Sequence, residues 1–207
     1  VMHGTQDVTA NYSITPVAGT LTILPKDVTI TAQDKEFAYT GETQTWPQYD
    51  AVGLVGSDAI TAVVEGSITF PSDGTVTNEL KSHEFTAGKP GNYSVTTENG
   101  KLMMTKNPAA TTLTAASNSW TYDGDAHSDT GYAAAFGEDL TGERQTDESF
   151  LLSTGDSLTA VVEGTITNAE TAMNEVTSYA VMRGEDDVTA FYTIGTVNGT
   201  LEVTKKA

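Results

Sequence analysis

The feature that most constrains the fold of this 207-residue chain is an internal repeat. Residues 1–26 align without a gap on residues 181–206, with 14 identities at a constant offset of 180. The segment 29–41 recurs as 112–124, and the segment 58–69 recurs as 156–167. A period of about 80 to 100 residues is too long for a solenoid repeat and fits a string of whole domains. The chain is therefore predicted to contain tandem domains of one kind.

The repeat divides the chain into three parts. Residues 1–26 are interpreted as the C-terminal part of an upstream repeat, 27–106 as a complete repeat, and 107–207 as a complete repeat with a longer acidic loop around 136–147. A tail of 26 residues is too short to bury a core, so we expect it to pack on a neighbour or on upstream chain of a longer protein. A different phase, with each domain starting at the Asn-Tyr segment, fits the sequence as well.

The local pattern predicts strands throughout. Val28, Ile30 and Ala32 alternate with polar residues, which places one side of a strand in a core and the other in solvent. The chain contains 36 threonines, whose branched β-carbon favours strands, and no sustained helical periodicity. Leu21 and Ile23 in the first tail, like Leu102 and Leu201 in the later ones, mark a closing strand. Almost no helix is expected.

The turn pattern refines the fold class. Asn99-Gly100 and Asn198-Gly199 separate alternating runs, and Asn-Gly is a strong signal for a type I′ hairpin. With six to eight short strands per repeat, the chain is predicted to be all-β and built of tandem immunoglobulin-like β-sandwich modules. A β-grasp-like unit is the alternative.

Composition excludes several classes of protein. The formal charge of −18 and the pI near 4.2 argue against nucleic acid or an anionic membrane as a partner. Without cysteine the chain has no disulfide, thiolate zinc site or cysteine nucleophile. No apolar run is long enough to span a bilayer, and residues 1–4 do not begin a signal peptide. We expect no membrane insertion.

The repeated motifs resemble those of a known family. The segment 29–41, Gly-Leu-Val-Gly-Ser-Asp at 53–58 and Asp-Val-Thr-Ala-Asn-Tyr-Ser-Ile at 7–14 are similar to the MBG ("mostly beta, glycine-rich") repeats of bacterial cell-surface proteins. The resemblance covers nearly the whole chain and implies adhesin-like stalk modules outside the cell, in the cell wall or secreted, especially in Gram-positive bacteria. It implies no catalytic site or cofactor. Phe191 departs from the asparagine found at Asn11 and Asn92.

Catalytic residues are not indicated. Glu65 and Glu163 recur after Val-Val and before glycine, and a glycosidase would need two carboxylates facing one cleft. Recurrence in each repeat favours an exposed strand end beside a glycine bulge. No Gly-x-Ser-x-Gly elbow occurs. We expect no enzyme, and an extracellular hydrolase is the least favoured alternative.

Metal and crosslink sites are weakly indicated. Asp123, Asp125 and Asp129 alternate as calcium ligands can, but the glycine and glutamate of a calcium loop are missing, which favours a polar turn. His3, His83 and His127 have no partner at metal-ligand spacing, so no metal site is predicted. An isopeptide crosslink would join a lysine near an opening strand to an asparagine near a closing one; the candidates are Lys26, Lys106, Asn11, Asn92, Asn99 and Asn198.

These observations predict non-catalytic extracellular stalk or spacer repeats, with a monomeric elongated shape and a capacity for adhesion. The alternative is a dedicated adhesin module that binds host glycans, mucin or a matrix protein. Trp46 has no counterpart in the other repeat, so it is the candidate ligand contact, with the acidic segment 136–147 as a second contact surface. No cofactor is expected.

Overall fold

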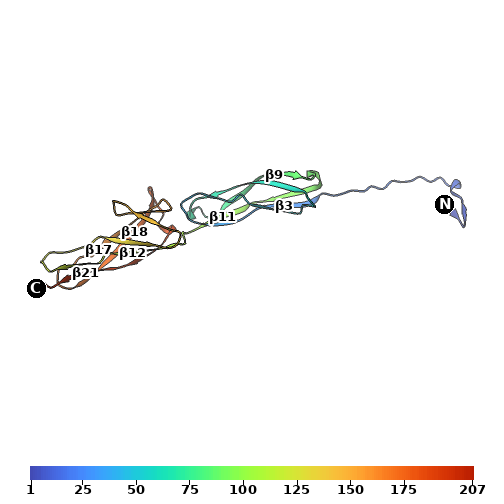
Figure 1. Cartoon of the computed structure of the whole chain (residues 1–207). Coiled ribbons are helices and arrows are strands. Elements are labelled where there is room, and N and C mark those ends of the chain that lie inside the picture. The colour runs from blue at the N-terminus through green and yellow to red at the C-terminus, as the bar shows by residue number, and fades with distance from the viewer.

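The computed structural model describes all residues, 1–207, and is nearly all β. It contains 21 strands, no α-helix and four short 3₁₀ turns: η1 (Thr9–Asn11), η2 (Pro71–Asp73), η3 (Pro90–Asn92) and η4 (Thr189–Phe191). The predictions of an all-β fold with almost no helix are confirmed. No helix is long and apolar enough to cross a membrane. The chain forms an elongated rod with its two termini at opposite ends (Figure 1).

Nine strands lie between residues 26 and 105, a region called the middle unit below. They form three sheets, with strand orders β10-β3-β6, β4-β11-β9-β7 and β5-β8. The strands are β3 (Lys26–Ala32), β4 (Lys35–Ala38), β5 (Gln44–Thr45), β6 (Tyr49–Val52), β7 (Ala59–Glu65), β8 (Ser67–Ile68), β9 (Val76–Ala87), β10 (Tyr93–Glu98) and β11 (Gly100–Thr105).

Ten strands lie between residues 110 and 204, called the last unit below. They form the sheets β14-β12-β20 and β13-β21-β18-β17-β16-β15, with β19 paired to β18. The strands are β12 (Ala110–Ala115), β13 (Asn118–Thr121), β14 (Tyr132–Phe136), β15 (Gly142–Arg144), β16 (Phe150–Leu152), β17 (Ser157–Glu163), β18 (Thr171–Arg183), β19 (Asp186–Asp187), β20 (Thr193–Val197) and β21 (Gly199–Thr204). Nine and ten strands exceed the six to eight expected.

The opening and closing segments of each unit run parallel. In the middle unit β3 pairs with β10 and β4 pairs with β11, while in the last unit β12 pairs with β20 and β13 with β21. The opening and the closing segment therefore pass from one sheet to the other side by side, at the same position along the unit. Because side chains alternate along β3, Val28, Ile30 and Ala32 are at most 1% exposed, as predicted.

The predicted Asn-Gly hairpins are wrong. Strands β10 and β11 lie in different sheets and do not pair with each other, and neither Gly100 nor Gly199 has a positive φ. The dipeptide marks the crossing between sheets. A β-carbon on Gly100 would lie 2.5 Å from the carbonyl oxygens of Ala32 and Gln33, so glycine is required here by close backbone approach.

The segment expected to be a lengthened surface loop, 136–147, contains the strand β15 and leads into β16. β16 pairs with β17 and β15 pairs with β16, so this part of the chain extends the sheet beyond β17. Leu140 of the segment is buried, as are Phe150 and Leu152 of β16. The corresponding strand of the middle unit, β7, is the edge of its sheet. The acidic composition of the insert predicted a surface loop, although its few apolar residues pack onto the unit.

The N-terminal segment forms only β1 (Met2–His3), β2 (Gln6–Asp7) and the turn η1, followed by extended chain. The closing strand predicted around Leu21 and Ile23 is not formed, and both side chains are almost fully exposed. Their counterparts Leu201 and Val203 are buried because β21 pairs with β13 and β18. No comparable partner is free for the first tail, since β4 already pairs with β11.

Candidate functional site

An aspartate and a tyrosine form the same hydrogen bond in each unit. The Tyr93 hydroxyl donates to Asp58 at 2.5 Å, and the Tyr192 hydroxyl donates to Asp156 at 2.5 Å. Each aspartate lies directly before the strand that ends in Val-Val-Glu. Below, the Asp58 pole denotes the end of the middle unit that carries Asp58 and Tyr93, and the Asp156 pole denotes the end of the last unit that carries Asp156 and Tyr192.

Local structure in the Asp-Val-Thr-Ala motif fixes the tyrosine of the Asp156 pole. The Asp187 carboxylate accepts a hydrogen bond from the Thr189 amide at 2.9 Å. The Thr189 side chain, together with this amide, holds the pKa of Asp187 below its usual value. Val188 between them is buried, and η4 follows at once. Tyr192 therefore enters β20 at a fixed position, with its side chain 5% exposed.

The Asp156 pole is also the contact between the two units. The hydroxyl of Tyr39, from the middle unit, donates to Asp156 at 3.0 Å, and Asp156 is fully buried. Arg183 Nε donates to the same carboxylate at 2.6 Å. The Arg183 guanidinium also donates to the carbonyl oxygens of Gly41 and Thr154, each at 2.6 Å. One buried charge thus connects the loop after β4 to the start of β17.

Aromatic packing surrounds this hydrogen-bond network. The Tyr39 ring centroid lies 5.2 Å from that of Phe191 and 5.8 Å from that of Tyr192, in edge-to-face arrangements. Phe70 of the middle unit stacks on Phe191 at 6.0 Å. Edge-to-face pairs at such distances are favourable beyond the area they bury. One hydrophobic cluster of 17 buried residues includes members of both units.

The linker is held at the same place. Asn107 donates from its side-chain amide to the Tyr39 carbonyl oxygen at 3.0 Å and from its backbone amide to the Phe191 carbonyl oxygen at 2.9 Å. Its side-chain oxygen accepts a hydrogen bond from the Ala109 amide. Asn107 is only 6% exposed. The residue between the units is therefore bonded to both of them and is not a free hinge.

The chemistry of the junction requires neutral tyrosines. Burial, with the hydrogen bond to Asp156, raises the pKa of Tyr39 to about 12, and the same causes raise the pKa of Tyr192. Gly41 has a φ of 83°, and a β-carbon there would lie 2.1 Å from the Thr154 carbonyl oxygen. Both the tyrosine and the glycine of the repeated Tyr-x-Gly motif thus have a role at this contact.

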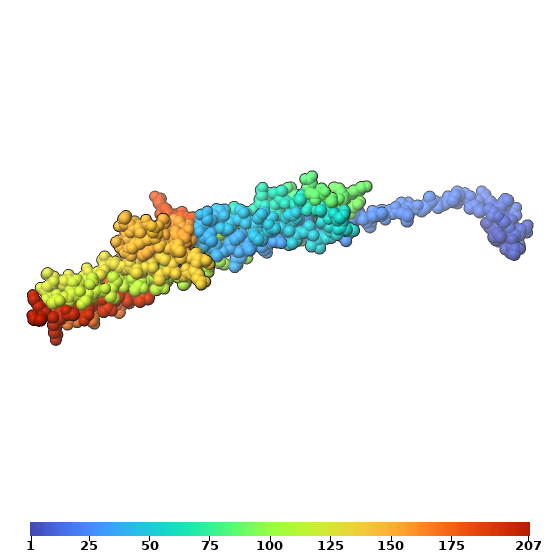
Figure 2. Space-filling model, in the orientation of Figure 1, coloured from blue at the N-terminus to red at the C-terminus, as the bar shows by residue number.

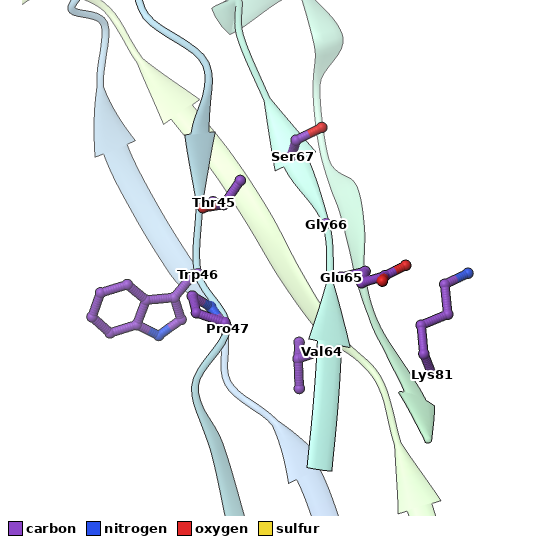
Figure 3. Close-up of a pocket in the computed structure, with 8 residues that line it drawn as sticks. All are labelled: Thr45, Trp46, Pro47, Val64, Glu65, Gly66, Ser67 and Lys81. Carbon is purple, nitrogen blue, oxygen red and sulfur yellow. The ribbon is translucent and has the colours of Figure 1, made fainter. Parts of the chain in front are cut away.

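The groove beside Trp46 is the second candidate site. A cavity of about 550 Å³ is lined by Trp46, Pro47, Glu65, Ser67 and Lys81, among others. In Figure 3 the Trp46 ring and the side chains of Glu65 and Lys81 point to opposite sides of the strands. The Trp46 ring is only partly exposed, and the Lys35 ammonium lies 4.5 Å from its centroid. The ring is therefore not an open platform for a sugar.

Two buried asparagines, not singled out from the sequence, explain the recurrent Glu-Gly motif. Asn78 donates to the carbonyl oxygens of Gln33 and Trp46, each at 2.9 Å, and Asn174 makes the corresponding two bonds in the last unit. A β-carbon on Gly66 would lie 2.7 Å from Asn78 Oδ1. The repeated Asn-Glu-aliphatic sequence at 78–80 and 174–176 was the available signal.

Glu65 and Glu163 are exposed at equivalent strand ends in two different units. The register of each strand shifts between its two valines, whereas Gly66 and Gly164 lie just after the strands end, so the irregularity is not the glycine bulge expected from the sequence. A cavity of about 480 Å³ beside Glu163 repeats the groove of the middle unit. The two carboxylates do not face one cleft.

The remaining sequence candidates are not brought together. Asp123 accepts hydrogen bonds from the Asp125 amide and from His127 Nε2, each at 3.0 Å, within one turn. No group of three or more histidine, aspartate or glutamate side chains is arranged to hold a metal ion. His3 and His83 are exposed. Neither Lys26 nor Lys106 forms an ion pair, and Asn99 accepts a hydrogen bond from the Leu80 amide.

No family model matches this sequence, and no curated protein matches it.

Proposed function

We propose that this chain is a non-catalytic, extracellular stalk segment of a bacterial surface protein, built of tandem immunoglobulin-like β-sandwich modules of the MBG type. The observation that carries the proposal is the junction at Asp156. A spacer must keep its modules in line, and a buried carboxylate bonded to Tyr39, Tyr192 and Arg183 fixes the orientation of one module on the next. The rod acts as a monomer and needs no cofactor.

The overall shape supports a spacer. The two units follow one another along a single long axis, and the insert forms a bulge beside the end of the middle unit (Figure 2). The surface carries a formal charge of −18, and like charges along a rod keep it extended and prevent self-association. Domain contacts within a chain are usually mobile unless they are large and apolar, so the shared core at this junction is significant.

The finer fold assignment rests on the sheets. A β-grasp unit packs a helix across its sheet, and this chain has only 3₁₀ turns of three residues. Each unit instead places two main sheets against a common core, with the opening segment contributing to both. Two sheets joined in this way favour the sandwich.

Spin labels test the stalk. The chain has no cysteine, so Thr61→Cys and Thr159→Cys place one label on the exposed side of β7 and one on the equivalent position of β17. We expect a single narrow distribution of label distances in the full chain. The Tyr39→Ala variant should broaden that distribution, while Thr130→Ala, away from the junction, should leave it narrow. A broad distribution in the unsubstituted chain would contradict a rigid spacer.

The Trp46 groove favours one second candidate, an adhesin module that binds host glycans, mucin or a matrix protein. A cavity of about 550 Å³ is lined by Trp46 and by the charged residues Glu65 and Lys81. The test is binding of the full chain to immobilised mucin, glycans and matrix proteins. Saturable binding lost with Trp46→Ala or on deletion of 136–147, but kept with Thr130→Ala in the equivalent groove, would support adhesion. If the folded chain binds none of these ligands, only the spacer function remains as a proposal.

A further inference from the structure

A second copy of the Tyr39 loop lies at the far end of the last unit. Tyr122 occupies the position of Tyr39: its amide donates to the Thr204 carbonyl oxygen at 2.8 Å, as that of Tyr39 donates to Thr105 at 3.0 Å. Gly124 has a φ of 91°, close to the 83° of Gly41. Tyr39 is fully buried in the junction, whereas Tyr122 is 41% exposed and its hydroxyl forms no hydrogen bond within the chain.

The surroundings of Tyr122 differ from those of Tyr39 in two ways. Asn168 stands where the middle unit has Phe70, because 165–167 aligns with 67–69. Lys206 stands where the middle unit has Asn107, because Thr204 corresponds to Thr105. Lys206 and Lys205, the counterpart of Lys106, lie beside Tyr122 and Asn168 around a cavity of about 430 Å³. This end of the last unit is called the Tyr122 plug below: Tyr122, Asp123, Gly124, Asn168, Lys205 and Lys206.

The Asp58 pole differs from the Asp156 pole at the matching positions. Strand register places Gly88 where the last unit has Arg183, since Ala59 faces Ala87 as Ser157 faces Met182. Asn92, before Tyr93, stands where Phe191 precedes Tyr192. Asp58 consequently accepts a side-chain hydrogen bond from Tyr93 alone and has no cationic partner.

The differences on the two surfaces complement each other. At the existing junction Phe70 meets Phe191, and the cation comes from the pole as Arg183. A contact between the Tyr122 plug and an Asp58-type pole would place Asn168 near the residue equivalent to Asn92. The cation for the aspartate of that pole would come from the plug, as Lys205 or Lys206. Compared with the existing junction, the aromatic pair is replaced by two asparagines, and the cation moves from the pole to the plug. Matched changes of this kind on both surfaces let an interface select its partner.

The repeat supplies an independent observation. Residues 1–26 share 14 identities with 181–206, including Lys26 and Lys206, and the unit that follows residue 26 carries the Asp58 pole. Residues 1–26, which resemble the C-terminal segment of the last unit, are therefore followed by a unit with an Asp58 pole. By contrast, the ending at 92–106 leads into the unit with the Asp156 pole.

We propose that the Tyr122 plug docks onto the Asp58-type pole of a following β unit in the same polypeptide. The Tyr122 hydroxyl donates to the aspartate of that pole, and the lysines of the plug neutralise it. The inference rests on the proposed function, because it needs tandem units. It adds that successive junctions alternate between two types. In one the cation beside the buried aspartate is an arginine of the pole, and in the other it is a lysine of the plug.

An extended chain tests the docking. Residues 1–206 are followed directly by a second copy of 27–106, which keeps the spacing between residues 26 and 27. Tetranitromethane modifies exposed tyrosines, and mass spectrometry of peptides reports the rate at each tyrosine. Docking should slow the modification of Tyr122 at least about tenfold relative to the 207-residue chain, which corresponds to about 1.4 kcal/mol of docking free energy. Tyr192, which is buried and occurs only once in each of these two chains, is the internal reference for protection.

Matched chains make the result specific. Asp58→Asn in the added unit should restore rapid modification of Tyr122, and so should Lys205→Ser with Lys206→Ser, which lie outside any core. A chain that ends in a second copy of 107–207, with Tyr122→Phe in the added copy so that only the first Tyr122 is read, should protect Tyr122 less. Unchanged modification in the extended chain, or equal protection by both kinds of added unit, would overturn the inference. Protection that rises with concentration in the 207-residue chain would assign the plug to a second copy and also overturn it.

The two proposals can fail separately. A narrow distance distribution between the labels on β7 and β17, together with an unprotected Tyr122, would leave the stalk intact and remove only the docking of the plug. A protected Tyr122 in a chain that binds mucin through Trp46 would keep the docking and change the function.

Discussion

The Asp58 and Asp156 poles share an aspartate and tyrosine in the same geometry, yet only one of them joins two units. At both poles the tyrosine hydroxyl lies 2.5 Å from the carboxylate. The Asp156 pole adds Arg183, Phe191 and the linker residue Asn107, and there the carboxylate is fully buried. The Asp–Tyr hydrogen bond thus stabilises each unit internally, and the residues around it determine whether this surface forms an interface with another unit.

The largest expected effect comes from removing the buried carboxylate. Asp156→Ala leaves Arg183 partly buried without its counter-ion and deprives Tyr39 and Tyr192 of their acceptor. Breaking a buried ion pair from one side costs about 3–5 kcal/mol. Denaturant unfolding followed by hydrogen exchange should show this loss in the last unit. Asp58→Ala, which leaves no cation unpaired, should cost much less; equal losses would mean that the poles do not differ as described.

Truncating the inserted tyrosine should come next. Tyr39→Ala removes a fully buried ring that contacts Phe191 and Tyr192, a loss of about 3 kcal/mol for a buried aromatic side chain. Because the ring spans both units, hydrogen exchange should become faster on each side of the junction. Tyr122→Ala, at the equivalent but exposed position, is the control and should leave exchange in the 207-residue chain nearly unchanged. A loss confined to the middle unit would contradict coupling through Tyr39.

Alkaline pH should loosen the junction before the units unfold. The pKa of Tyr39 is raised to about 12, so the folded state favours the neutral phenol. This contribution is fully present below the unfolded pKa of about 10 and is lost as the pH rises through about 12. The label distances between β7 and β17 should therefore broaden in this range. Tyr39→Phe should weaken the pH dependence, and an identical profile in that variant would assign the change to other groups.

The smallest effect is expected from making one pole resemble the other. Phe191→Asn introduces the residue found at Asn92 and removes the ring pairs with Tyr39 and Phe70. Each such pair contributes about 1 kcal/mol beyond its buried area. A modest fall in the unfolding midpoint, with broader label distances, should follow. Asn92→Phe is the reverse change and should alter neither measurement, because Asn92 has no neighbouring unit against it in this chain.

Sequence reasoning succeeded where one local pattern decides the structure. Alternation identified Val28, Ile30 and Leu102 as core residues, and all are at most 1% exposed. It failed where a pattern has two physical explanations. Asn99-Gly100 satisfies the requirements of a hairpin turn, but here glycine is needed because the backbone of Ala32 and Gln33 passes close by. A sequence alone does not distinguish a positive φ from a close approach.

The junction was harder to predict because its residues act across the boundary between repeats. Asp156, Tyr192 and Tyr39 each have a counterpart in the other repeat, and recurrence does not distinguish a contact within a unit from a contact between units. Nothing in one sequence shows that Tyr39 contacts the neighbouring unit 117 positions away at Asp156. Arg183 aligns with His3 in the repeat, and no sequence pattern identifies its partners, because they come together only after both units have folded.

The parallel pairing of opening and closing strands determines how a unit responds to a pull on its ends. Tension along the rod draws β3 toward the N-terminal end and β11 toward the C-terminal end. The bonds that β3 makes with β10 over Lys26–Thr31, and those of β11 with β4, run across the direction of that pull. They are loaded together in shear and do not open one after another from an end. Each unit is therefore suited to resist extension, with its greatest strength along the axis on which the next unit follows.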